Sequence, residues 1–551
     1  MATNSRVHWW TSVSLMLVGG AMAAAFLEPN QPLKARKRSA EDKGVLRVAY
    51  TSKLSPDPHR RLFPLPQYNQ LMLSLWEPLV ECDPATSQPR PACAKDWAWS
   101  PDHLTLTLHL RPDAQWSNGD RVTAADFVRG WLRLLRQPMT EAAALFPLKN
   151  AVAFHQQTVT DPRSVGMRAI SDDTLELALD QPRSTLVVEL ADPLLSPLHA
   201  TSEEVLASGS YVATPAKLVT NGPFRLTVAS EEGFMLEVNH YFHDAAGVRL
   251  AGIKLIRAEN SVVAPLLLAA GVVDFLSPAP YGGSAKVPTD RPIRLEHELE
   301  LSVCSLDFNV TRGPLRDVRV RQALALALDR TGAIEKLDPQ RMVAARSWVP
   351  SMPGRAGLVL LKEDVAEARR LLAAAGFPGG RGFPILRMAL PMWMDQDPFP
   401  LAWSEQWFQE LGIKTYIAYE PREQRAARMR AGDFDVLCNL LTATVPDAGD
   451  LLGIFLWPPD FTGNKWVDQS AAKLLGEANT KTGSDRLAIL EQAERNIMAA
   501  IPSVPVMFER RQTLLAAEVG GWYPDPLGRQ SLKRFWLDLP AVREPTKAPL
   551  L

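Results

Sequence analysis

Few residues in this chain have the types and spacing that catalysis or metal binding requires. His297-Glu298-Leu299-Glu300 begins like a zinc-protease helix, but it lacks the second histidine that would complete the metal site. The phosphate-binding GxxxxGK motif, the nucleophilic GxSxG turn and a Gly-rich dinucleotide loop between a strand and a helix are missing, and the nine histidines are scattered singly. The sequence therefore predicts a protein that is not an enzyme and needs no cofactor or metal.

The four cysteines allow two interpretations. Cys82 and Cys93 flank a turn-rich segment, where they could form a disulfide in an oxidising compartment; two free thiols are an equally good alternative. Cys304 and Cys438 lie in strand-like runs, so we expect them in the core. No CxxC or Cys/His spacing supports a metal site.

Length and charge narrow the class of protein further. A chain of 551 residues is too long for one hydrophobic core. Its 46% hydrophobic and 22% charged residues are typical of a globular protein. A formal net charge of -1 argues against general binding to nucleic acid.

The elements that would position any site are clearest between Leu104 and Trp131. Apolar residues alternate with polar ones from Leu104 to Leu110, which predicts a half-buried strand. A turn around Gly119 follows, and Thr123 is expected to cap a helix with Asp126 in its first turn. This stretch carries no reactive group, so we expect it to have a structural role.

The same stretch resembles the motif "LRxxxxWxxGxxxTAxDfxxxW" of extracytoplasmic solute-binding protein family 5, the oligopeptide- and dipeptide-binding proteins of ATP-driven (ABC) importers. More than ten further motifs follow in the family's order between Gly44 and Trp536. They include TNGPF at 220–224, similar to "TNGPYxL"; PLRDVRVRQALALALDR at 314–330, similar to "PlxDvrVRqAlxxAidR"; and EDVAEARRLLAAAGF at 363–377, similar to "dxxkAkxLLaeAGf".

The resemblance implies an α/β, two-lobed periplasmic-binding-protein-like fold (type II, cluster C-like). It implies these units: lobe I at 44–303 and 501–539, with an inserted subdomain at about 91–215; lobe II at 304–500; and a C-terminal tail at 540–551. The two lobes would close on a solute held between them.

The resemblance also implies where a peptide ligand would bind. In the family, an adjacent Trp and acidic residue follow a buried strand, and the acid receives the ligand's ammonium group. This segment is Leu440 to Asp450 here, where Leu441 occupies the Trp position and Thr444 the acid position. A hydroxyl binds ammonium more weakly than a carboxylate does, so Asp447, or Asp450 by a small register shift, could take the role; a turn or a helix cap is the alternative for both. The other candidate ligand-binding residues are Thr442, Asn309, Arg422, Tyr68 and Trp393.

The first 43 residues read as a targeting segment and a charged linker. Trp9–Leu27 is uncharged and long enough to cross a bilayer. It is either a cleaved signal peptide or a membrane anchor. The basic cluster at 34–38 would favour keeping the following chain in the cytoplasm, whereas the resemblance favours export to the periplasm or the outer face of the membrane.

The expected function is therefore that of the solute-binding component of an ABC peptide importer. It would capture an oligopeptide or a related small solute by hinge closure. Its partners would be the permease subunits and their ATPase, and it would be a monomer. The alternative is a membrane-tethered receptor, sensor or scaffold that kept the fold without peptide transport.

Overall fold

A computed structural model of the chain describes residues 34–60, 66–279, 289–458 and 462–539. The expected signal or anchor at Trp9–Leu27 and the expected tail at 540–551 lie outside these residues. Within the described ranges, no helix combines the length and the apolar character needed to cross a membrane.

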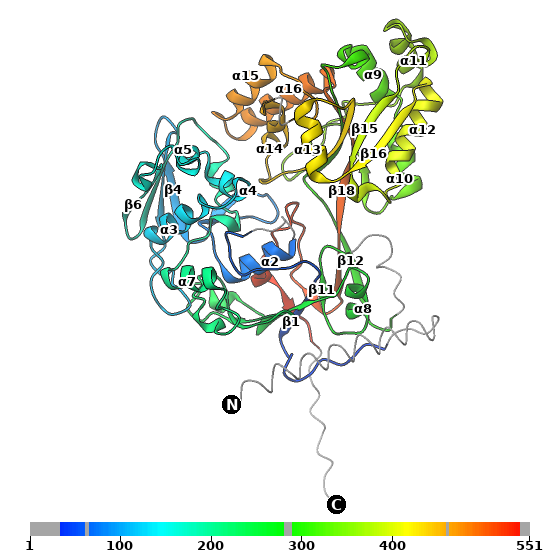
Figure 1. Cartoon of the computed structure of the whole chain (residues 1–551). Coiled ribbons are helices and arrows are strands. Elements are labelled where there is room, and N and C mark those ends of the chain that lie inside the picture. The colour runs from blue at the N-terminus through cyan, green and yellow to red at the C-terminus, as the bar shows by residue number, and fades with distance from the viewer. Residues whose placement is uncertain (1–33, 61–65, 280–288, 459–461, 540–551) are drawn as a thin grey trace, which may run out of the picture.

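One long strand, β18 (Ser503–Ala516), joins the two halves of the molecule (Figure 1). Its first part pairs with β13 (Ser302–Phe308) and β14 (Met342–Ala344), and its second part pairs with β12 (Ile293–Leu299) and β11 (Phe275–Leu276). The resulting sheet has twelve strands, with the order β16-β15-β17-β13-β18-β11-β1-β10-β9-β8 along its main path.

Two separate hydrophobic cores flank this shared strand. The larger core takes its buried residues from 46–275 and 515–535, and we call this half lobe I. The second takes its buried residues from 301–508, and we call this half lobe II. The chain crosses between the lobes from β12 to β13 and again along β18. The two-lobed α/β fold expected from the sequence is therefore observed.

Lobe I is built on β1, which pairs in parallel with β10 and β11, while β8 and β9 extend the sheet antiparallel. The bounds of the elements in this part are β1 (Val45–Tyr50), α2 (Pro66–Leu75), β2 (Val80–Cys82), β3 (Pro89–Pro91), β8 (Phe224–Ala229), β9 (Gly233–Val238), β10 (Gly252–Arg257), α8 (Val263–Ala269), β19 (Val519–Gly520) and β20 (Trp536–Leu537).

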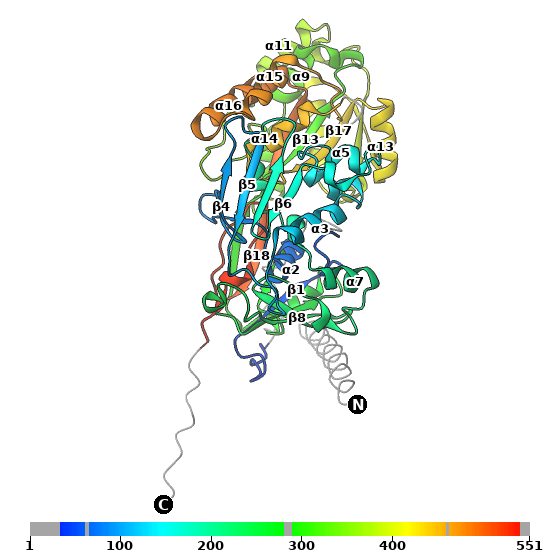
Figure 2. The same cartoon turned by 90° about the vertical axis from the view of Figure 1, so that its left-hand side faces the viewer.

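An antiparallel sheet of four strands, in the order β4-β5-β7-β6, is inserted into lobe I. Figure 2 shows β4, β5 and β6 alongside one another. Its elements are β4 (Ala94–Trp99), β5 (Thr105–Leu110), α3 (Ala124–Leu134), α4 (Met139–Ala142), α5 (Ala151–His155), β6 (Met167–Ser171), β7 (Thr174–Ala178), α6 (Leu186–Glu189) and α7 (Ala200–Ser208). Its buried side chains belong to the same core as the rest of lobe I.

The strand–turn–helix predicted at the start of this insertion is confirmed. Side chains of β5 alternate between buried and half-buried, because successive residues point to opposite faces of the sheet. Gly119 has a φ of +92° in the turn, a conformation that glycine adopts without steric cost. Asp126 accepts hydrogen bonds from the backbone N–H and the hydroxyl of Thr123 at the start of α3.

Lobe II packs helices around the β13-β17-β15-β16 part of the sheet, in which β15 pairs in parallel with both β16 and β17. Its elements are α9 (Val318–Leu326), α10 (Arg330–Leu337), α11 (Val365–Ala374), β15 (Leu386–Pro391), α12 (Phe399–Leu411), β16 (Thr415–Glu420), α13 (Arg422–Ala431), β17 (Val436–Thr442), α14 (Ala448–Leu452), α15 (Gln469–Ala478) and α16 (Gly483–Ala500).

All four cysteines are free thiols. The possible Cys82–Cys93 disulfide is not formed, because the β2–β3 hairpin pairs Cys82 with Pro89 and leaves Cys93 beyond its end. The Cys93 Sγ instead lies 3.3 Å from Glu77 Oε2, in a fully buried position. Cys304 and Cys438 are buried on β13 and β17, as expected for core residues.

Candidate ligand-binding site

The segment from Thr442 to Asp450 leaves the sheet at the end of β17, on the side of lobe II where the chain crosses to lobe I. Its first turn is fixed by the Ala443 N–H, which donates to the Leu301 carbonyl at 2.7 Å. Asp450 stabilises this turn, because its Oδ2 accepts from the backbone N–H and the hydroxyl of Thr444 at 2.5 and 3.1 Å. The Thr444 side chain is exposed, but its hydroxyl already donates to Asp450.

Asp447 begins the short helix α14. Its Oδ1 accepts from the Gly449 N–H at 2.7 Å, as expected of an N-cap residue. Arg486 on α16 donates to Oδ1 and Oδ2 of the same carboxylate at 2.6 and 3.1 Å. Both oxygens of Asp447 are therefore engaged within lobe II.

A loop of lobe I between Tyr523 and Ser531 faces this segment. Glu298 on β12 holds the loop: its carboxylate accepts from the Asp525 N–H at 2.6 Å and from the Gln530 amide at 3.1 and 3.0 Å. Burial raises the pKa of Glu298, although Arg511, at 2.7 Å, opposes this shift. Gly528 has a φ of +66°, and a Cβ there would lie 2.8 Å from Arg511 Nη1, so the tight turn requires glycine. The loop thereby presents Arg529 in a fixed position.

Arg529 brings the two lobes into contact. Its Nη2 donates to Asp192 Oδ2 in lobe I at 2.8 Å and to the Thr444 carbonyl in lobe II at 2.6 Å. A second contact between the lobes joins the Ser184 N–H to the Asn479 carbonyl at 3.2 Å. The side chain of Arg529 is only 8% exposed. A cation therefore contacts the backbone of Thr444, the residue at which the family resemblance places an acid, while the Thr444 side chain contacts Asp450.

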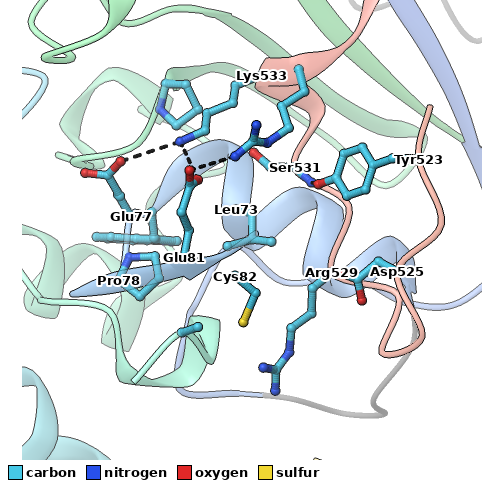
Figure 3. Close-up of a pocket in the computed structure, with 14 residues that line it drawn as sticks. Leu73, Glu77, Pro78, Glu81, Cys82, Tyr523, Asp525, Arg529, Ser531 and Lys533 are labelled. Carbon is cyan, nitrogen blue, oxygen red and sulfur yellow. Dashed lines mark hydrogen bonds and ion pairs between the residues drawn. The ribbon is translucent and has the colours of Figure 1, made fainter. Parts of the chain in front are cut away.

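Arg529 also lines a pocket on lobe I (Figure 3). The lining residues are Leu73, Trp76, Glu77, Pro78, Glu81, Cys82, Ala191, Pro223, Tyr523, Asp525, Arg529, Ser531, Lys533 and Arg534. On one side, Glu81 forms ion pairs with Lys533 at 2.9 Å and with Arg534 at 2.7 Å. Burial would raise the pKa of Glu81, but these two cations lower it. The guanidinium of Arg529 extends away from this group, toward the side of Cys82.

The other residues expected at the site lie in varied surroundings. Tyr68 is buried in α2, and its hydroxyl donates to the Pro58 carbonyl at 2.7 Å. Asn309 is buried and donates to the Gly432 and Phe434 carbonyls. Arg422 is exposed at the first position of α13, and Trp393 is 57% exposed after β15.

Leu441 and Thr442 end β17, opposite Val303 and Ser302 of β13. Leu441 is half-buried against the core of lobe II, and Thr442 is exposed. The structure thus keeps Leu441, Thr442, Thr444 and Asp447 together on one segment. It places Asn309 near the opposite end of β13 from Ser302.

Sequence reasoning missed Arg529 and Asp192. They are 337 positions apart, and Arg529 is 85 positions from Thr444. No periodicity or motif links positions so distant in sequence. The only local signal is the clustering of Arg529, Lys533 and Arg534 in one short segment. Among the residues that the structure describes, no group of three His, Cys, Asp or Glu side chains could hold a metal ion.

Comparison with known proteins agrees with this architecture. The family model for bacterial extracellular solute-binding proteins, family 5 (middle) matches residues 88–463. The probable deoxycholate-binding periplasmic protein YgiS of Escherichia coli strain K12 is 29% identical, over 82% of this chain and 86% of that protein. The periplasmic oligopeptide-binding protein OppA of Salmonella typhimurium strain LT2 is 25% identical, over 96% and 99%.

The solved structures agree as well. The unliganded open form of the periplasmic murein tripeptide-binding protein MppA superposes with a TM-score of 0.79 at 24% identity, covering 90% of this chain and 97% of that one. HbpA2 of Haemophilus parasuis gives a TM-score of 0.76 at 18% identity, covering 90% and 100%. These likenesses concern the fold, while the family model covers more than half of the chain. The chain therefore belongs to the bacterial extracellular solute-binding proteins, family 5.

Proposed function

We propose that this protein is the binding component of an ABC importer, which captures an oligopeptide or a related small solute between its two lobes outside the cytoplasm. The observation that carries the proposal is the pairing of two separate cores with one shared strand, β18. Two such lobes can rotate about the crossing strands and bury a solute between them. OppA and MppA, by their names, bind oligopeptides and murein peptides, which supports a peptide as the solute.

The proposed units are lobe I at 44–303 and 501–539, with its insertion at about 91–215, and lobe II at 304–500. The solute would contact the segment from Leu441 to Asp447, including Thr442 and Thr444. Tyr68, Asn309, Arg422 and Trp393 are proposed as further contributors from neighbouring elements. Binding without catalysis is supported by the relatives, whose names describe binding proteins.

The same proposal implies that the protein is exported and passes its solute to a membrane permease. The relatives are named as periplasmic proteins. Trp9–Leu27 would direct export, either as a signal that is removed or as an anchor that holds a monomer at the outer face of the membrane. The closed form would then dock on a membrane permease coupled to an ATPase. Sequencing the N-terminus of the mature protein distinguishes the cleaved from the anchored form.

Native mass spectrometry of the purified protein tests the function directly, because a solute trapped between closed lobes is retained during purification. Calorimetry with a library of short peptides is the second measurement, and we expect saturable heat for a subset. A protein that carries no solute and gives no heat with any peptide would contradict the proposal.

A further inference from the structure

Arg529 has an unused donor inside the candidate site. Its Nη2 serves Asp192 and Thr444, but among the described residues its buried Nη1 has no hydrogen-bond partner. Leaving a buried polar group without a partner costs free energy, and the cost is larger for a charged group. The side chain is 8% exposed, so bulk water has little access to it. Arg529 is one of the residues that line the pocket, and a solute oxygen placed against Nη1 would supply the partner that this donor lacks.

The acids around Arg529 already accept hydrogen bonds within the protein: Asp192 accepts from Arg529 itself, and Asp525 accepts from the Leu527 N–H. Asp450 is bound to the Thr444 turn, and Asp447 is bound to Arg486 and the start of α14. On the lobe I side, Glu81 is paired with Lys533 and Arg534. A ligand ammonium at Thr444 would meet the guanidinium of Arg529 at the Thr444 carbonyl. On the side of the Thr444 hydroxyl it would meet the carboxylate of Asp450, one oxygen of which already accepts three hydrogen bonds from the turn.

The apolar residues in the pocket lining indicate which kind of group the solute carries next to its charged end. Leu73, Trp76, Ala191 and Pro223 are the apolar residues that line the same pocket as Arg529. An arginine fork matches the planar geometry of a carboxylate, and charge-assisted hydrogen bonds are about twice as strong as neutral ones. The combination fits an acid head group attached to an apolar body.

Resting on the proposed function, we propose that the solute is bound by a carboxylate, which accepts a hydrogen bond from Arg529 Nη1 beside Thr444. The site is thereby reversed in charge: it selects an acidic end of the solute instead of an ammonium group. Two sources share this chemistry, the C-terminal carboxylate of a peptide and the carboxylate of an apolar acid such as deoxycholate.

Calorimetry with matched probes tests the proposal. The peptide pair is trialanine and its C-terminal amide, and the apolar pair is deoxycholate and its methyl ester. We expect at least one free acid to bind more tightly than its neutral partner. Because a hydrogen bond to a charged group contributes about 1.5–3 kcal/mol, Arg529→Gln should weaken that acid by roughly 10- to 100-fold and leave the neutral partner within about twofold.

Arg291→Gln is the matched control. Arg291 is also in lobe I, is 7% exposed, and pairs with Asp274 at 2.7 Å, but it lies near α8 and β11, and it donates to the Leu268 and Val273 carbonyls. We expect no change in the preference for acids. If Arg529→Gln folds poorly because Asp192 loses its ion pair with Arg529, the double variant with Asp192→Asn removes both charges and makes the same prediction.

Each outcome decides the proposal. Equal binding of acid and neutral partners, or equal losses for both in Arg529→Gln, would show that Arg529 only links the lobes and would overturn it. Failure of all four probes would refute the carboxylate subsite for both sources. If a neutral or cationic solute then co-purifies with the protein, the binding function stands and only the carboxylate assignment fails.

Discussion

Removing the charge of Asp447 should destabilise lobe II. Asp447→Asn keeps the N-cap of α14, because asparagine caps as well as aspartate does, but it removes the ion pair with Arg486. The two side chains are 18% and 8% exposed. Arg486 also donates to the Ala478 carbonyl at the end of α15, so one cation ties three helices together.

The magnitude follows from these contacts. Breaking a buried ion pair on one side costs about 3–5 kcal/mol, and the partial exposure of Asp447 places the expected loss near the lower end, at about 3 kcal/mol. Asp447→Ala also removes the cap, which adds about 1 kcal/mol. Urea denaturation followed by tryptophan fluorescence measures both losses.

Asp468 provides the matched control, because it caps α15 by accepting from the Ala471 N–H at 2.7 Å and forms no ion pair among the described residues. Asp468→Asn should change stability by less than about 0.5 kcal/mol and Asp468→Ala by about 1 kcal/mol. If Asp447→Asn is as mild as Asp468→Asn, the reasoning is refuted. A mild change in stability combined with a selective loss of peptides that have free N-termini would instead make Asp447 the ammonium partner.

Three further predictions concern pH, thiols and the scaffold. Burial and the nearby charge of Glu300 raise the pKa of Glu509 to about 7. The folded state therefore binds more protons than the unfolded state between about pH 5 and 7, and the free energy of unfolding should fall as the pH rises through this window. Thermal melts of Glu509→Gln should lack this fall. All four thiols should react with Ellman's reagent only after denaturation, because the described cysteines are free and mostly buried; two reactive thiols after denaturation would instead indicate a disulfide. Asp126→Ala should lower the urea midpoint by removing the acceptor for Thr123 and Trp116, with a loss of about 1–3 kcal/mol; an unchanged midpoint would contradict the role of this carboxylate.

The local elements could be predicted because each depends on neighbours in sequence. The alternation from Leu104 to Leu110 produced a strand, and the predicted cap at Thr123 lies one residue before α3. The helix expected in 363–377 is α11, which ends before Gly376. These patterns indicate which face of an element is apolar, because the helix and strand periods place residues of fixed spacing on one face.

The sequence predicted candidate site residues mainly on lobe II and none on the loop that carries Arg529. The family resemblance places the candidate segment from Leu441 to Asp447 after a buried strand, and its contact with the solute stays a prediction. The hydrogen-bond partners of this segment could not be predicted, because those of Asp447 and Thr444 come from α16 and from the loop that carries Arg529. The disulfide question was also open in the sequence, and the register of the β2–β3 hairpin decided it.

The sequence by itself determined the family, the two-lobed α/β fold and the absence of an acid at position 444. The tertiary structure alone decided which charged groups contact that position, Asp450 from lobe II and Arg529 from lobe I. Arg529 reaches Thr444 only because β18 returns the end of the chain to lobe I and Glu298 holds the following loop. Such a contact depends on strand pairing between distant segments, and pairing over that distance leaves no periodic signal in the sequence.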